Sequence, residues 1–103
     1  MIVYEVNLDV DAGIAADYRA WLDVHVGEIL ALPGFTGARI LEVQEPAPPP
    51  ARIALCVQYT LVDAAALDGY LREHAPRLRA DGVARFGDGF RAHRRILRGA
   101  GAS

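Results

Sequence analysis

Cysteine is almost absent from the sequence: Cys56 is the only one among 103 residues, so no disulfide can form within the chain. A lone thiol is typical of proteins in reducing compartments, and we expect a cytoplasmic location. The first residues include no positively charged segment followed by a long apolar run, and no stretch approaches the ~20 apolar residues of a membrane helix. We therefore expect neither a signal peptide nor a membrane partner.

An excess of positive charge is also missing. The formal net charge is −2, so no basic field attracts nucleic acid, and no nucleic-acid partner is expected. The hydrophobic content of 52% is that of a folded chain, and 103 residues have room for one domain. We assign this single domain to residues 1–98 and expect the small-residue tail, 99–103, to be disordered.

Sequence patterns of common catalytic sites are missing as well. The chain contains no glycine-rich phosphate loop, no nucleophile elbow and no pair of catalytic carboxylates. Cys56 has no neighbouring base that would make it a nucleophile. His25, His74 and Cys56 fall on different predicted elements and lack the spacing of metal ligands, so no metal and no cofactor are expected.

Hydrophobic periodicity shows which elements are present. Four segments alternate apolar and polar residues with the period of a β-strand, namely 2–10, 35–45, 53–61 and 90–98. Two segments repeat apolar residues at helical spacing: one spans roughly 14–31, and the other follows Asp63. Pro76 interrupts the second segment, which predicts a kink or a fresh helix start near Ala75.

The predicted order is strand, helix, strand, strand, helix, strand, and the sequence contains a short internal repeat. The pattern aromatic-Leu-x-x-His occurs at residues 21–25 in the first helix and again at 70–74 in the second. A duplicated βαβ unit with interleaved halves is the ferredoxin-like sandwich. We therefore predict an α+β fold, βαββαβ, with a four-stranded antiparallel sheet and two helices on one face.

Two helices can cover only one face of such a sheet. The other face is predicted to carry Glu5 and Asp9, and Arg91 and Arg95 face them if the last strand lies beside the first. Apolar residues share this open face, which favours a partner, and most soluble oligomers are two-fold homodimers. The alternative is a sheet face exposed to solvent, which is common in antiparallel sheets.

Three stretches of the chain resemble a known family. They are W-L-x-x-H-V-x-x-x-L-x-L-P-G-F at residues 21–35, Y-L-x-x-H-A-P-R-L-R-A-D-G at 70–82 and R-F-G-x-x-F-R-A at 85–92. Together they resemble a bacterial family of uncharacterised proteins in the dimeric α/β-barrel superfamily, beside antibiotic-biosynthesis monooxygenase domains. The resemblance implies a ferredoxin-like protomer and a homodimer whose open sheet faces meet as an α/β barrel. It implies no established reaction.

Two histidines and two arginines are candidates for a functional site. His25 and His74 lie on or beside the apolar stripes of the helices, either as pKa-tuned groups in a pocket or as singly hydrogen-bonded residues at the helix–sheet edges. By strict alternation, Arg39 and Arg94 point to the helix-covered face. There they either receive a carboxylate or phosphate of a ligand or reach water through a bulge, which Gly37 could mark, or at a sheet edge.

Aromatic residues complete the candidate site: four of them either line a cavity for an aromatic ligand or belong to the core, namely Tyr4, Trp21, Tyr59 and Tyr70. The sequence thus favours a homodimer that binds a small apolar or aromatic ligand. The alternatives are a purely structural dimer and a monooxygenase-like or isomerase-like enzyme that uses His25 or His74. The ligand-binding and enzyme hypotheses differ in whether the candidate histidines and arginines converge on one cavity.

Overall fold

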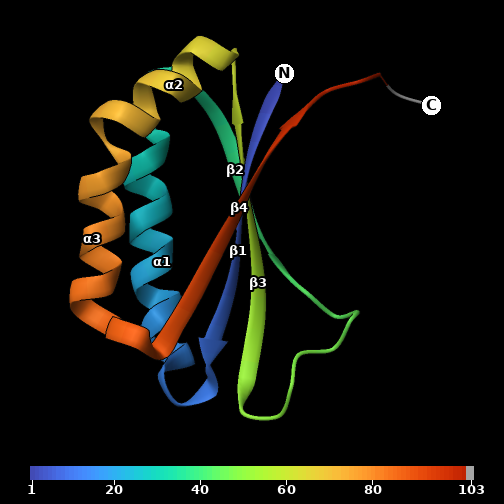
Figure 1. Ribbon diagram of the computed structural model, residues 1–103, viewed down its shortest axis with the longest axis vertical. Helices are drawn as coiled ribbons and strands as arrows, with labels where there is room; N and C mark the ends of the chain where they lie inside the picture. The colour runs from blue at the N-terminus through green and yellow to red at the C-terminus, as the bar shows by residue number, and fades with distance from the viewer. Residues whose placement is uncertain (102–103) are drawn as a thin grey trace.

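The computed structural model describes residues 1–101, in which one layer of helices covers one sheet (Figure 1). Within these residues, the strands are β1 (Ile2–Asp11), β2 (Phe35–Glu42), β3 (Arg52–Leu61) and β4 (Phe90–Arg98). The α-helices are α1 (Ala15–Leu30), α2 (Ala64–Glu73) and α3 (Ala75–Phe86). Two short 3₁₀ turns, Ala12–Ile14 and Gly87–Gly89, precede α1 and follow α3.

β1 lies inside the sheet, whose strand order is β2-β3-β1-β4. It pairs antiparallel with β3, where Tyr4 lies opposite Tyr59, and antiparallel with β4, where Glu5 lies opposite Arg95. The labelled helices all cover the same side of the sheet in Figure 1. This is the ferredoxin-like α+β arrangement, and the predicted fold is confirmed.

The second helical segment is broken at His74, which confirms the break that we predicted near Ala75 from the presence of Pro76. α2 ends one residue before His74, and α3 starts one residue after it with Pro76 in its first turn. A proline is tolerated there because the first N–H groups of a helix have no partner within the helix. Asp63 caps the N-terminus of α2, and its carboxylate accepts a hydrogen bond from the backbone N–H of Ala66 at 2.9 Å.

The start of β2 departs from the predicted alternation. The pairing with β3 shifts register between Phe35 and Gly37, which is a β-bulge. After the bulge, Ala38 lies opposite Tyr59 and packs against the core, so Arg39 points to the open face. The prediction that Arg39 faces the helices is wrong, because the alternation was counted through the extra residue.

The hydrophobic core lies between the helices and the sheet. α1 contributes a buried stripe of Tyr18, Leu22, Val26 and Ile29, whose spacing is that of one helix face. Burial of each such side chain stabilises the fold by about 1.5–3 kcal/mol. The largest side chains that are almost completely buried are Tyr18, Tyr59, Ile29, Leu61, Leu78, Val10 and Val57.

The open face of the sheet carries a hydrogen-bonded network around Glu5, whose side chain is only 3% exposed. Arg95 Nε donates to Glu5 Oε2 at 2.6 Å, and Asn7 Nδ2 donates to the same oxygen at 3.0 Å. Gln58 Nε2 donates to Glu5 Oε1 at 3.0 Å, and Gln58 Oε1 accepts from Arg39 Nε at 2.9 Å. These donors, Arg95 first among them, hold the pKa of Glu5 down at about 2.

A second carboxylate on the open face, that of Asp9, is also matched by an arginine. Asp9 lies opposite Arg91 in the sheet as predicted, but its ion pair is with Arg52 of β3, whose Nε is 2.7 Å from Asp9 Oδ1. Cys56 is half-buried near Glu5, and burial together with the Glu5 charge raises the pKa of its thiol. The acidic groups of Glu5 and Asp9 are therefore compensated within the chain.

The tail predicted for residues 99–103 is described only as far as Gly101. Gly99 donates its backbone N–H to the carbonyl oxygen of Met1 at 2.9 Å, so pairing beside β1 continues to this residue. Residues 102 and 103 lie outside the described residues, and the expected disorder stays a prediction. Among residues 1–101, no helix combines the length and the apolar character needed to span a bilayer.

Candidate functional site

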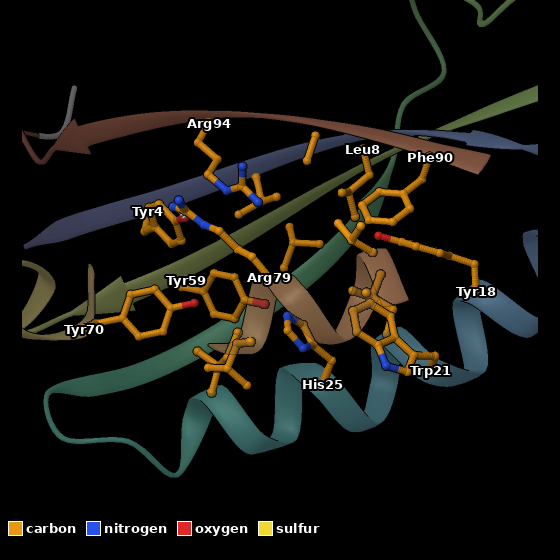
Figure 2. Close-up of a pocket in the computed structure, with 18 of the residues that line it drawn as sticks. Tyr4, Leu8, Tyr18, Trp21, His25, Tyr59, Tyr70, Arg79, Phe90 and Arg94 are labelled. Carbon is orange, nitrogen blue, oxygen red and sulfur yellow. Dashed lines mark hydrogen bonds between the residues drawn. The ribbon is translucent and has the colours of Figure 1, made fainter. Parts of the chain in front are cut away.

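A cavity of about 330 Å³ lies between the helices and the sheet (Figure 2). Residues of β1, β3 and β4 form its floor, and residues of α1 and α3 form the opposite wall. Its volume falls within the range of small-molecule binding sites. Much of the lining is aromatic or aliphatic, and the residues labelled in Figure 2 are Tyr4, Leu8, Tyr18, Trp21, His25, Tyr59, Tyr70, Arg79, Phe90 and Arg94.

Aromatic rings from α1 and β4 meet at one end of the cavity. The ring centroid of Tyr18 is 5.5 Å from that of Trp21 and 5.0 Å from that of Phe90, in the tilted geometry that aromatic pairs favour. Gly82 of α3 faces this cluster: a Cβ at Gly82 would lie 3.0 Å from Trp21 Cη2 and 3.3 Å from Phe90 Cζ. The missing side chain therefore lets the indole lie close against α3.

Polar groups lie farther along the same cavity, away from the aromatic cluster. His25 stacks on Trp21 with ring centroids 4.5 Å apart, and Arg79 of α3 donates from Nη2 to the Tyr4 hydroxyl at 2.9 Å. Figure 2 shows Arg94 of β4 and Arg79 reaching toward the same end of the cavity, beside Tyr4. Within the described part of the chain, no Asp or Glu lines this cavity.

Burial keeps the tyrosines of the cavity in their neutral forms. It raises the pKa of Tyr18 and of Tyr70 to about 12, and it raises the pKa of Tyr59 as well. The positive charge of Arg94 opposes the pKa shift at all three residues. The hydroxyl groups are therefore available as hydrogen-bond donors and acceptors, in a space that the Arg94 charge reaches.

Burial also favours the neutral form of the His25 imidazole. Burial lowers its pKa first, and the charge of Arg94 lowers it further, whereas Glu28 and Asp81 oppose the shift. His25 is therefore a neutral imidazole near pH 7. In that state it can accept a proton or a hydrogen bond from a ligand.

Most of the predicted site residues converge on this cavity, and those that line it are Trp21, His25, Tyr59, Tyr70 and Arg94. His74 lies at the α2–α3 break and lines a second cavity of about 170 Å³, with its Nδ1 3.2 Å from Arg77 Nη2. Arg39 lies on the open face of the sheet, where it contacts Gln58. Of the four predicted histidines and arginines, only His25 and Arg94 share a cavity.

Arg79 is the charged lining residue that sequence analysis missed. Ala75, Leu78 and Gly82 are the buried residues of α3, and Arg79 follows Ala75 by four positions and precedes Gly82 by three. Residues at these spacings are neighbours on a helix surface, so Arg79 borders the buried stripe. A long side chain beside a buried stripe can lay its stem along the core and direct its charge into an adjoining space.

The donor groups of the cavity suit an organic ligand. Guanidinium groups, tyrosine hydroxyls and one imidazole form hydrogen bonds with oxygen and nitrogen atoms of small molecules. No group of three or more His, Cys, Asp or Glu side chains within residues 1–101 is arranged to hold a metal ion.

Several solved structures share the fold of this chain. A candidate antibiotic biosynthesis monooxygenase from Deinococcus radiodurans is similar with a TM-score of 0.75 and 13% identity, over 100% of this chain and 96% of that chain. SnoaB, a cofactor-independent oxygenase from Streptomyces nogalater, has a TM-score of 0.70 and 13% identity, over 98% and 95%. A dimeric ferredoxin-like protein of unknown function from Jannaschia sp. has a TM-score of 0.55 and 24% identity, over 92% and 98%. At these identities the likeness shows the fold alone.

The family of the chain is shown by its sequence. No curated protein matches it in sequence. Residues 1–100 match the family described as a domain of unknown function, DUF4286, and this range includes every residue that lines the cavity. The resemblance to a family of unknown function that shares its fold with antibiotic-biosynthesis monooxygenases is confirmed. The chain belongs to the DUF4286 family of domains of unknown function.

Proposed function

We propose that this protein binds a small, mostly apolar aromatic ligand in the cavity between α1, α3 and the sheet, and that it does so as a homodimer. The observation that carries the proposal is the cavity itself, with a volume of about 330 Å³. Protein interiors normally contain few voids larger than a water molecule. A space of this size therefore supports ligand binding better than a role in core packing.

The lining chemistry supports an aromatic ligand in particular. Tyr18, Trp21 and Phe90 offer ring faces and edges at one end of the cavity. Offset or edge-to-face contacts between rings add about 0.5–1.5 kcal/mol per pair beyond the burial of apolar area. Tyr59 and Tyr70 add hydroxyl groups that orient polar substituents.

N-phenyl-1-naphthylamine tests this proposal, because it is a neutral aromatic dye whose fluorescence rises in apolar surroundings. We expect saturable binding to the wild type and a loss of binding in Ala92→Phe, since Ala92 lines the cavity and a phenyl ring there fills part of it. Ala84→Phe is the matched control, because Ala84 is exposed on α3 and does not line the cavity. Thermal unfolding checks that each variant keeps its fold. Equal binding by all three proteins, or none by the wild type, would overturn the proposal.

The open face of the sheet supports the homodimer. Half-buried apolar groups from Val3, Ala54 and Leu97 lie there beside the compensated Glu5 network. Since Glu5 is already paired within its own chain, a second copy can cover this face without burying an unpaired carboxylate. The dimeric Jannaschia protein has the same fold.

Native mass spectrometry and light scattering test the dimer. We expect a dimer for the wild type and a shift toward monomer for Leu41→Glu, because Leu41 lies on the open face and a two-fold axis brings the new charges of the two copies together. Val24→Glu is the control, since Val24 is 64% exposed on α1, on the other side of the sheet. A monomeric wild type at micromolar concentration would rule out this part of the proposal.

Partial convergence of the predicted residues supports a second candidate function, an enzyme of the monooxygenase-like or isomerase-like type: His25 and Arg94 share the cavity, whereas His74 and Arg39 lie elsewhere. His25 is a neutral imidazole inside the cavity, in position to accept a proton from a bound ligand. Incubation with hydroxylated naphthalenes, followed by oxygen uptake and mass spectrometry of the products, tests this candidate. Conversion by the wild type that is lost in His25→Gln would support it, and equal conversion by both proteins would remove His25 from any mechanism.

A further inference from the structure

We propose that the ligand of the helix–sheet cavity is an aromatic anion, an arylcarboxylate, whose carboxylate group is received by Arg79 and Arg94. This inference rests on the proposed ligand-binding function and adds the charge of the ligand and the residues that recognise it. Three observations on the cavity support it.

The first observation is the charge balance of the cavity lining. The chain as a whole carries 13 acidic residues against 11 basic ones. The cavity reverses this balance, because two arginines and no Asp or Glu of the described chain line it. Two like charges directed at one space repel each other, and an anion placed between them removes that repulsion. The cavity is therefore complementary to a negatively charged ligand.

The second observation is that these two guanidinium groups keep free donors. Arg79 donates one hydrogen bond, to the Tyr4 hydroxyl, although a guanidinium has five N–H groups. Neither Arg79 nor Arg94 forms an ion pair within residues 1–101, whereas Arg95 pairs with Glu5 there. A carboxylate matches the fork of a guanidinium with two parallel hydrogen bonds, which makes it the anion that these donors fit best.

The third observation is the separation of the two kinds of lining along the cavity. The rings of Trp21 and Phe90 lie toward one end, and the two arginines reach toward the other, beside Tyr4 (Figure 2). A ligand with an apolar ring at one end and a carboxylate at the other satisfies both ends at once. Because both arginines are exposed at the protein surface, the carboxylate lies near the mouth of the cavity and the ring lies inside.

Calorimetric titration with 2-naphthoate and 2-naphthamide tests this inference, because the two probes have nearly the same size and differ in charge at pH 7. We expect the wild type to bind 2-naphthoate about tenfold more tightly than 2-naphthamide, since charge-assisted hydrogen bonds exceed neutral ones by roughly that factor. The preference is expected to shrink at high salt, because the receiving groups are partly solvent-exposed.

Arginine variants assign the effect to its residues. Arg79→Gln and Arg94→Gln are each expected to weaken 2-naphthoate binding about tenfold and to change 2-naphthamide binding by less than about twofold. Arg85→Gln is the matched control, because Arg85 is exposed on the same helix as Arg79 and does not line the cavity. Arg94→Lys keeps the charge but loses the fork, so its affinity for 2-naphthoate is expected to fall between wild type and Arg94→Gln.

The outcomes separate this inference from the proposed function. Equal affinity for the two probes, or equal loss of both in the arginine variants, would overturn the anion assignment while binding of the neutral dye upheld the cavity as a ligand site. Failure of the neutral dye and of both naphthalene probes to bind would overturn the ligand site as well. A preference for 2-naphthoate that survives both glutamine variants would exclude Arg79 and Arg94 as its receivers.

Discussion

The two faces of the sheet use arginine in opposite ways. On the open face, Arg95 pairs with Glu5 and Arg52 pairs with Asp9, so these guanidinium groups have carboxylate partners within the chain. On the helix-covered face, the two cavity arginines have no such partner among the described residues. Compensated charge suits a surface that another protein copy covers, and uncompensated charge suits a site that an anion enters.

The difference arises from neighbouring residues of one strand. Tyr4 points into the cavity and Glu5 points to the open face, because successive side chains of β1 lie on opposite sides of the sheet. A single strand thus supplies a hydrogen-bond acceptor for Arg79 on one side and an ion-pair partner for Arg95 on the other.

Truncation of neighbouring residues on β3 tests the difference in burial and is expected to have the largest effect. Leu55 is 3% exposed on the helix-covered face, so Leu55→Ala should lower the free energy of unfolding by about 2–5 kcal/mol. Cys56 is half-buried on the open face, so Cys56→Ala should lower it by less than about 1 kcal/mol. Urea denaturation at a protein concentration low enough to dissociate the proposed dimer measures both. Losses of equal size would show that the two faces are equally buried.

Removal of the Glu5 charge tests the compensation on the open face. Glu5→Gln should lower the free energy of unfolding by about 1–2 kcal/mol, since it replaces a charge-assisted hydrogen bond with Arg95, whose side chain is 62% exposed and therefore partly screened. Glu42→Gln is the control, because Glu42 is exposed and forms no ion pair within residues 1–101. Equal effects of the two substitutions would contradict the role of the network.

Acid unfolding tests the same Glu5 network through the pH dependence of the free energy of unfolding. The pKa of Glu5 is lowered from 4.5 to about 2 in the folded protein, so the unfolded chain takes up this proton first. The Glu5 contribution to stability is therefore complete above about pH 4.5 and is lost as the pH falls toward about 2. We expect the wild type to lose more stability than Glu5→Gln over this window. Parallel pH profiles would contradict the low pKa.

Titration of His25 by NMR tests the helix-covered face of the sheet. The expected change in pKa is the smallest of these effects. We expect its pKa to lie below 6.5, mainly because of burial. Arg94→Gln should raise the pKa of His25, because it removes a positive charge that opposes protonation, while the opposing influences of Glu28 and Asp81 remain. Arg85→Gln is the control. An unchanged pKa in Arg94→Gln would place the Arg94 charge away from the imidazole.

Sequence periodicity predicted the fold because each element carries its own pattern. The alternation around Tyr4 and the helical spacing from Tyr18 to Ile29 depend only on nearby residues, and both are present in the structure. The face of Arg39 was predicted wrongly because the bulge after Phe35 shifts the pairing of β2 with β3. A bulge depends on contacts between strands, so local alternation does not reveal it.

The candidate site was predicted less completely than the fold. Trp21 and Tyr70, which the sequence left open as cavity or core residues, both line the cavity, and their role in binding stays a prediction. The place of His74 depended on the break between α2 and α3, which turns its side chain toward a different cavity. The role of Arg79 depended on how α3 lies against β1, and that packing is set by contacts between segments 75 residues apart.

Gly82 lines the cavity without a side chain, so a single methyl group added there, as in Gly82→Ala, would change the cavity. Alanine at this position would improve the helix propensity of α3 by about 1 kcal/mol, but its Cβ would press on the indole of Trp21 from 3.0 Å. Gly82 and Trp21 both line the cavity, so a shift of the ring by a few tenths of an ångström would change the shape of that space. Alanine at position 82 would therefore exchange cavity volume for a more stable helix.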